Sequence, residues 1–158
     1  MTKEELKAKI AEICPSATYD EAGEWLTVMV EAQNWFPVAW QLRANQALAF
    51  DYLFSLTAVD WKTHLSVVYH LRSFKHDHII VVKAKVDRAR PEIESVSKIW
   101  RTAELNEREA YDLMGVKFTN HPDLRRLFLT EDWEGYPLRK DYVDDVNIIK
   151  LQTLEFEV

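Results

Sequence analysis

The stretch from Glu107 to Tyr142 holds the densest set of residues whose types could do chemistry. It reads EREAYDLMGVKFTNHPDLRRLFLTEDWEGYPLRKDY, so charges of both signs alternate with aromatic residues and prolines. A catalytic cleft would need a nucleophile or a cofactor loop beside such charges. Aromatic anchors, arginines for bidentate contacts and prolines that lower the entropy of ordering suit a segment that docks on another protein. We therefore interpret the stretch as a docking segment.

The LRKDY motif near its end supports this interpretation. If the motif is extended, Arg139 and Asp141 face one way, while Leu138 and Lys140 face the other. Both faces then need partners, which the surface of one domain supplies poorly.

The histidines are weaker candidates for a site. His76 and His78 form an H-x-H pair beside Asp77, a pattern found among metal ligands. No third or fourth ligand lies nearby in the sequence, so we interpret the pair as exposed residues of a turn. His121 precedes Pro122 among several charges, which favours a hydrogen-bonding role in an ordered loop over a catalytic role.

Nucleophiles and paired acids also have ordinary explanations. Cys14 is the only cysteine, and its place at the apolar side of a predicted helix indicates a buried, unreactive thiol. A single cysteine forms no internal disulfide and cannot supply the four ligands of an iron–sulfur cluster. The spacings Glu104–Arg108 and Arg108–Asp112 are both i,i+4, so we expect ion pairs along one helix.

Composition narrows the class of protein further. The 158 residues favour one domain, and 47% apolar with 29% charged residues fit a soluble protein with a core. The net charge of −6 gives no basic footprint for nucleic acid, and no apolar run approaches a membrane helix. The N-terminal pattern is not that of a signal peptide, so we expect a cytoplasmic or equivalent location. Three glycines are too few for a P-loop or dinucleotide fingerprint.

The elements that must position these residues begin with a helix capped by Thr2 and Glu5 and ended by Pro15. A second helix is predicted over 35–45, with Pro37 in its first turn. Two segments joined by the polar SFKHD form a predicted antiparallel hairpin. The predicted strands are a short one at Tyr19, Trp25–Val30, the second half of 50–61 ending at Asp60, Leu65–Leu71 and His78–Val86.

The second half of the chain predicts three further helices. Pro91 opens the first helix, whose core stripe is Ile93, Val96 and Trp100. The second helix is Ala103–Met114, and Gly115 ends it. Pro122 opens the third helix, which has Leu124, Leu127 and Phe128 on one face. Residues 116–118 are predicted to be extended and the chain after Thr130 to be irregular. The fold class is therefore α+β: a two-layer mixed sheet of about four or five strands with helices on one face. We expect a core domain over 1–118 and an irregular C-terminal segment over 119–158.

From Trp100 to Tyr142 the sequence resembles the C-type subunit of respiratory complex I, the proton-pumping NADH–quinone oxidoreductase. The family pattern is W-x-x-A, E-R-E-x-[FY]-D, G-[IV]-x-F-x-x-H-P-x-L-R-R and W-x-G-x-P-L-R-K-D-[FY]. It matches Trp100, Ala103, Glu107–Glu109, Tyr111, Asp112, Gly115, Val116, Phe118, His121, Pro122, Leu124–Arg126, Trp133, Gly135 and Pro137–Tyr142. Leu56–Asp60 and Tyr69–Leu71 match more loosely, and Tyr136 stands where many members have His.

The resemblance implies a non-catalytic structural and assembly subunit of the peripheral arm. Such a subunit docks onto the larger D-type subunit near the quinone site, beside the iron–sulfur subunits, at the cytoplasmic face of the energy-transducing membrane. It carries no cofactor and meets the membrane only through the complex, while the assembly uses iron–sulfur clusters, flavin, NADH and quinone. The residues expected at the partner interface are Glu107, Arg108, Asp112, His121, Arg125, Arg126, Trp133, Arg139, Lys140 and Asp141.

Two alternatives remain open at this point. The chain could be the equivalent subunit of a membrane-bound hydrogenase or of a ferredoxin-fed photosynthetic complex. It could also be an independent enzyme in which His121 and an acidic neighbour form an acid–base pair. The tail after Tyr142 carries apolar residues such as Ile148 and Phe156, so we expect it to become ordered on a partner.

Overall fold

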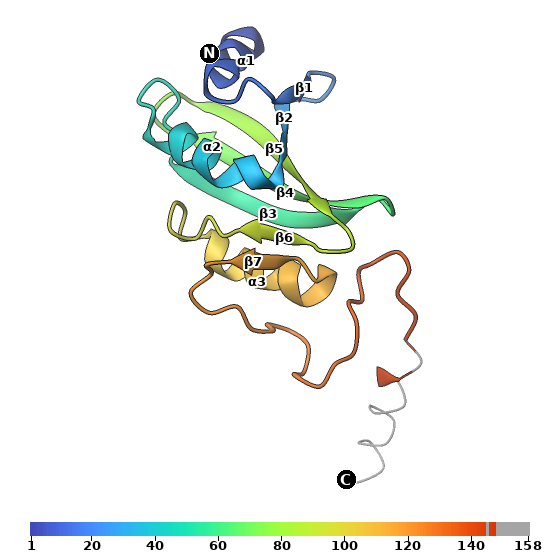
Figure 1. Ribbon diagram of the computed structural model, residues 1–158. Helices are drawn as coiled ribbons and strands as arrows, with labels where there is room; N and C mark the ends of the chain where they lie inside the picture. Colours follow the sequence, from blue (N-terminus) through green and yellow to red (C-terminus); the bar gives the residue numbers. More distant parts are fainter. Residues whose placement is uncertain (145, 148–158) are drawn as a thin grey trace.

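The computed structural model describes residues 1–144, 146 and 147 (Figure 1). Their helices are α1 (Lys3–Ile13), α2 (Ala32–Ala44) and α3 (Ala103–Met114). Their strands are β1 (Thr18–Asp20), β2 (Leu26–Glu31), β3 (Tyr52–Asp60), β4 (His64–Ser73), β5 (His78–Asp87), β6 (Glu92–Glu94) and β7 (Lys117–Thr119). None of the helices in this part of the chain has the length and hydropathy of a membrane span.

The main sheet has five strands in the order β1-β2-β5-β4-β3. β2 and β5 are parallel, while the other neighbouring pairs are antiparallel, so the sheet is mixed. The predicted hairpin is confirmed as β4 and β5, with Leu71 opposite Ile80 and Leu65 opposite Val86. A second, two-stranded parallel sheet joins β6 to β7.

One face of the main sheet carries the core. Ile80, Val82, Ala84 and Val86 of β5 are buried, while Lys83 and Lys85 point to the opposite face, as the alternation predicts. Buried side chains from all three helices join the same apolar cluster, so the helices share one face of the sheet (Figure 1). The predicted α+β class and its arrangement are therefore confirmed.

Local signals explain where several elements begin and end. Thr2 and Glu5 form the predicted capping box at the start of α1. Gly115 ends α3 in the left-handed conformation, with φ of 71°, as predicted. Helix α2 begins at Ala32, earlier than predicted, so Pro37 lies inside the helix and not in its first turn. Strand β3 ends at Asp60 as predicted but already begins at Tyr52.

The helix predicted after Pro91 is wrong. Residues 92–94 form strand β6 instead, which pairs with β7. The Lys117 backbone N–H of β7 donates to the Pro91 carbonyl just before β6. The predicted core stripe of Ile93, Val96 and Trp100 is nevertheless buried. The apolar positions were identified correctly, but pairing with a distant strand replaced local helical bonds.

The helix predicted after Pro122 is also wrong. The backbone N–H groups of residues 127–129 donate to the Asp112 carboxylate, and the carbonyls of residues 125 and 126 accept from Arg108. These side chains of α3 satisfy backbone groups that a helix would have paired internally. The segment therefore remains irregular.

Candidate functional site

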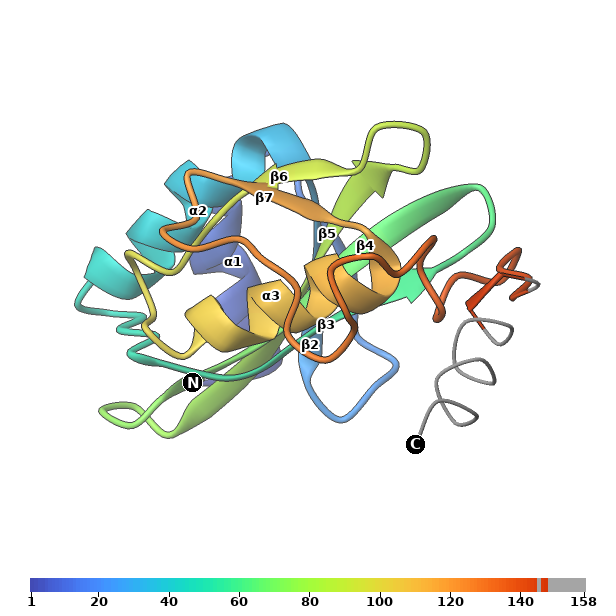
Figure 2. The same ribbon diagram turned by 90° about the horizontal axis from the view of Figure 1, so that it is seen from below.

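Residues 120–144, 146 and 147 are here called the C-terminal segment. From 120 to 144 and at 146 they form turns, bends and irregular backbone, with no helix or strand. The segment runs along α3 and then past the end of β3 (Figures 1 and 2). It contains much of the stretch predicted to dock on a partner. Four polar anchors attach it to the rest of the chain.

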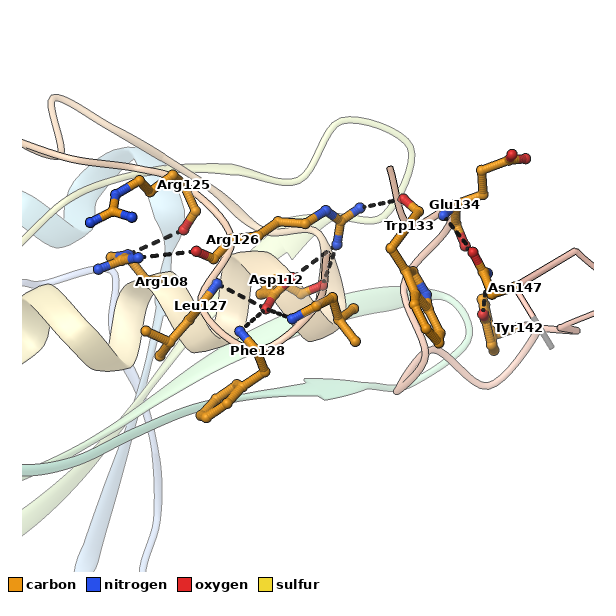
Figure 3. Close-up of polar contacts among 11 residues, drawn as sticks. Arg108, Asp112, Arg125, Arg126, Leu127, Phe128, Trp133, Glu134, Tyr142 and Asn147 are labelled. Carbon is orange, nitrogen blue, oxygen red and sulfur yellow. Dashed lines mark hydrogen bonds and ion pairs between the residues drawn. The ribbon is translucent and has the colours of Figure 1, made fainter. Parts of the chain in front are cut away.

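Asp112 of α3 is the first anchor. Its Oδ2 accepts backbone N–H bonds from Leu127, Phe128 and Leu129 at 3.0, 2.7 and 3.0 Å. Its Oδ1 accepts from the Arg126 guanidinium at 2.9 Å (Figure 3). Burial raises the pKa of this carboxyl, but the backbone and arginine donors outweigh burial and leave the pKa below its ordinary value. Asp112 therefore holds the segment as a buried, ionised acceptor.

Two arginines form the second anchor: Arg126 of the segment and Arg108 of α3. Arg126 also donates to the Trp133 carbonyl at 3.0 Å, so it bridges α3 and the next loop. Arg108 donates to the carbonyls of Arg125 and Arg126 at 3.1 and 3.0 Å (Figure 3). The expected i,i+4 ion pairs of Arg108 within α3 are not formed, because its guanidinium is engaged with the segment.

Asp60, at the end of β3, is the third anchor. Arg88 donates to both of its carboxylate oxygens, at 3.2 and 3.0 Å, and the Lys140 backbone N–H donates at 3.0 Å. The Arg88 guanidinium also holds Asp141 of the segment at 2.7 Å. Mainly because of the Arg88 hydrogen bonds, the pKa of Asp60 lies far below its ordinary value.

Arg139 supplies the fourth anchor. Its Nε donates to the Met114 carbonyl at 2.8 Å, at the C-terminus of α3, where a cation is favoured. Its guanidinium lies 4.9 Å from the centroid of the Tyr136 ring. That ring covers Gly115 so closely that a Cβ there would lie 2.6 Å from it. Glycine at 115 thus ends the helix and also admits the tyrosine.

Glu107 lies in a separate buried cluster beneath the segment. Ser95 Oγ and the Val96 N–H donate to its carboxylate at 2.5 and 2.8 Å. Burial raises the pKa of Glu107 to about 7 despite these donors. His121 Nε2 lies 3.7 Å from the carboxylate but 2.9 Å from the Glu104 carbonyl, while its Nδ1 accepts from the Asp123 N–H. His121 has the predicted hydrogen-bonding role in an ordered loop.

The ten predicted interface residues thus differ in surroundings. Glu107, Arg108 and Asp112 are buried inside the chain, and His121, Arg126, Arg139 and Asp141 also have partners within it. Arg125 pairs with Asp123, and Arg125 and Lys140 are both exposed. Contact with another subunit stays a prediction for all ten, but the expectation that Arg139 and Asp141 lack partners on their own domain is wrong.

The segment instead presents apolar side chains to the outside. Phe128, Leu138 and Val143 are 64%, 60% and 75% exposed, and Leu105 of α3 is 58% exposed. Exposed apolar side chains gathered on one segment are typical of interaction surfaces. Among the described residues, these side chains form the largely uncovered apolar part of the site.

The other histidines hold a loop. His76 Nε2 and His78 Nε2 donate to the carbonyls of Gln46 and Leu48, each at 2.8 Å. His78 is buried, so its predicted exposure is wrong. Among the described residues no cluster of His, Cys, Asp and Glu could hold a metal ion. Cys14 is buried, as predicted.

Sequence reasoning missed four contributors to the site. Asp60 was noted only as a strand end, Arg88 was not singled out, and Ser95 was placed in a helix. Asn147 was missed as well; it exchanges hydrogen bonds with the Glu134 backbone at 3.1 and 3.0 Å (Figure 3). Asp60, at the end of a predicted strand, was the one available signal in the sequence, because a buried acid needs a partner elsewhere in the chain.

Comparison with known families gives a match to the family model described as respiratory-chain NADH dehydrogenase, 30 Kd subunit, over residues 28–146. An NADH-quinone oxidoreductase C/D subunit of Phocaeicola vulgatus is 47% identical over 116 residues, which is 72% of this chain and 22% of that protein. A C-type NADH-quinone oxidoreductase subunit of Chloroherpeton thalassium is 44% identical over 110 residues, 68% of this chain and 46% of that protein. The chain therefore matches less than half of the length of either relative.

Two solved structures share the fold. A chain of the membrane-bound sulfane sulfur reductase, an archaeal respiratory membrane complex, aligns with a TM-score of 0.69 and 28% identity, over 94% of this chain and 89% of that chain. A trypsin-resistant fragment of Nqo5 aligns with a TM-score of 0.65 and 24% identity, over 78% of this chain and all of the fragment.

Proposed function

Because the chain belongs to the family of the 30-kDa subunit of respiratory-chain NADH dehydrogenases, we propose that it is a structural and assembly subunit of the peripheral arm of a proton-pumping NADH–quinone oxidoreductase. It docks onto the D-type subunit near the quinone site, beside iron–sulfur subunits, at the cytoplasmic face of the membrane. The reaction belongs to the assembly, and this chain holds no cofactor of its own.

The proposed partner is supported by a relative whose name joins the C-type and the D-type subunit. The Phocaeicola vulgatus protein is a C/D subunit, and the matched region is only 22% of its length. A C-type domain that shares one polypeptide with a D-type domain stays close to it at high effective concentration. A separate C-type chain reaches the same arrangement through a non-covalent interface.

The observation that carries this proposal is the contrast within the C-terminal segment. Polar groups of the segment such as the Arg126 and Arg139 guanidinium groups have partners in the chain, while Phe128 and Leu138 remain exposed on a backbone held in place by Asp112 and Arg139. Rigid presentation of apolar side chains lowers the entropy cost of binding. Apolar anchors of this kind carry much of the energy of protein interfaces.

Co-purification of the D-type subunit with a double variant tests the proposal. Phe128→Ser with Leu138→Ser should weaken association with this partner at least about tenfold, because interface anchors are each worth about 2 kcal/mol. The matched control is Trp40→Ser with Phe74→Ser, which removes two equally exposed apolar side chains from α2 and the β4–β5 turn. Equal yields of the partner with both double variants would contradict the proposal.

Arg139→Ala tests whether the fixed position of the segment matters. Removing the Arg139 bond to the Met114 carbonyl should weaken association with the D-type subunit, while the urea midpoint of the sheet domain stays unchanged. An unchanged yield of the complex would show that this anchor is dispensable. The absence of a cofactor is tested by absorption spectroscopy and metal analysis of the purified chain.

A second candidate function is favoured by the archaeal neighbour. It aligns over 94% of this chain and comes from a different respiratory membrane complex. The equivalent subunit of a related complex, such as a membrane-bound hydrogenase or a ferredoxin-fed complex, would keep the same docking segment. Reduction of quinone by NADH in the purified assembly separates the two candidates.

A further inference from the structure

The face of the main sheet that points away from the helices carries a groove of about 480 Å³. Its floor is formed by Lys83 and Lys85 of β5, beside Met29 of β2 and Ser66 of β4, which the strand register places next to them. Trp61, from the β3–β4 turn, is half exposed and stacks on His64 at the end of the groove. The groove shares no residue with the C-terminal segment.

The two lysines of the floor have no ion-pair partner among the described residues. Neither side chain forms a hydrogen bond or ion pair there, whereas Lys7 and Lys117 pair with carboxylates. Glu31 is the one acid that lines the groove; it lies opposite Lys85 in the register but makes no ion pair with it. Two unpaired cations side by side repel one another, so an added anion is favoured there.

We propose that this groove binds an extended acidic segment of a partner protein, with carboxylates at alternate positions. Lys83 and Lys85 are two residues apart on one strand, so they are about 6.7 Å apart along it. Alternate side chains of an extended peptide have the same spacing and point the same way. Such a segment, running along β5, places one carboxylate on each ammonium group, while Trp61 and Met29 give apolar contact at its sides.

The chemistry of the surroundings selects this occupant. A nucleic acid would also offer spaced anions, but the whole chain carries a net charge of −6 and would repel it. A peptide adds apolar side chains that Trp61 and Met29 can cover, and both are exposed by more than a third of their surface. The groove is lined by β1, β2, β4 and β5 and therefore offers a second contact, apart from the one proposed for the C-terminal segment.

Titration of the isolated chain with two peptides tests this proposal, with backbone NMR shifts as the readout. The probe is Glu-Val-Glu-Val-Glu, and its control is the same composition with the acids together, Glu-Glu-Glu-Val-Val. At low ionic strength, where screening is weak, the alternating peptide should shift the amides of β4 and β5 and saturate. Equal binding of the two peptides would overturn the proposal.

The lysine variants supply the second arm. Lys83→Gln with Lys85→Gln should weaken binding of the alternating peptide about tenfold, because two exposed ion pairs together are worth about 1.4 kcal/mol. Lys75→Gln with Lys98→Gln changes the net charge equally at two exposed lysines outside the groove and should leave binding unchanged. If both double variants bind alike, or if inorganic phosphate displaces the peptide from the groove at equal concentration, the site is not a peptide site.

Acetylation of lysines in the purified assembly provides the third arm. Lys83 and Lys85 should react about tenfold more slowly in the assembly than in the isolated chain, since a bound carboxylate covers each amine. The same rate in both states would overturn the proposal. If the assembly forms but Lys83 and Lys85 react in it as fast as in the isolated chain, the groove proposal fails, while docking of the C-terminal segment stays supported. The two proposals therefore fail separately.

Discussion

The sheet domain and the C-terminal segment are stabilised by different interactions. In the sheet domain, β4 and β5 pair along ten residues each, and their inward side chains pack with Trp35 and Leu42 of α2. In the segment, the described residues form neither helix nor strand before residue 147, and side chains such as Asp112 hold its backbone. Apolar burial acts over the whole core, whereas each polar anchor fixes a few residues.

This difference predicts two levels of stability in one chain. A core that shares one apolar cluster unfolds as a unit. A segment held by separate polar anchors can open locally at a lower free energy while the core remains folded. A partner that binds the closed segment would then stabilise the segment more than the sheet.

The largest expected effect comes from the core. Trp35→Ala removes a fully buried ring that lies 4.5 Å from Tyr69 and stacks on Trp100. It should lower the free energy of unfolding by about 4 kcal/mol, measured by urea denaturation, and should release the segment at the same transition. Trp40→Ala, at an exposed position of the same helix, is the control and should change little.

Asp112→Ala should act on the segment alone. It leaves the N–H groups of residues 127–129 without their acceptor and removes the carboxylate that pairs with Arg126, at a cost of about 3 kcal/mol. Cleavage by trypsin after Arg125 and Arg126 should accelerate about a hundredfold, with an unchanged core transition in urea. Glu109→Ala, an exposed acid of the same helix, is the control. Loss of the core transition would contradict the separation into two levels.

Glu107→Gln should change how stability depends on pH. The folded chain keeps the Glu107 proton up to about pH 7, while the unfolded chain loses it near the ordinary value of 4.5. Unfolding therefore releases this proton between those values, and wild-type stability falls as pH rises through the window. The variant lacks this fall and should gain about 3 kcal/mol over wild type above pH 7.

Urea midpoints on both sides of this window measure the effect. Glu109→Gln, at an exposed site of the same helix, should keep the wild-type slope. Asp112 has the opposite sign: because its pKa is lowered, its stabilisation is present at neutral pH and is lost only as the pH falls in the acid range. A parallel pH profile for wild type and Glu107→Gln would refute the assignment.

The smallest effect is expected at the junction of the two regions. Gly115→Ala forces a side chain into the left-handed conformation, which costs about 1–2 kcal/mol, and pushes the Tyr136 ring away. Gly23→Ala is the control, because its Cβ would lie 3.7 Å from the Trp25 carbonyl oxygen, which is an ordinary van der Waals contact. In the background of Tyr136→Ala the loss should shrink to the backbone strain alone, which a double-mutant cycle in urea resolves.

Local patterns were sufficient to predict much of the sheet domain. The alternation in β5, the capping box of α1 and Gly115 after α3 are all encoded within a few residues, and each prediction is confirmed. The helix predicted after Pro91 failed because β7, some twenty-five residues later, pairs with that stretch. Apolar spacing identified buried positions there but not the type of element.

The anchors of the segment were beyond such patterns. Asp112 bonds residues 15 to 17 positions later, and Asp60 accepts from the Lys140 backbone 80 positions away. The composition of the stretch indicated a structural role but could not distinguish partners within the chain from partners outside it. Asp112, Arg126 and Arg139 proved to have partners within the chain, whereas apolar side chains such as Phe128 and Leu138 are exposed beside them.

The bond between Asp60 and the Lys140 backbone also sets an order of events during folding. It joins positions 80 residues apart, and Arg88 links the same carboxylate to Asp141 across 53. Closing so long a loop is slow unless the intervening chain is already compact. The C-terminal segment therefore closes onto a finished sheet, and the folding chain passes through a stage in which its sheet is complete and its C-terminal segment is still free.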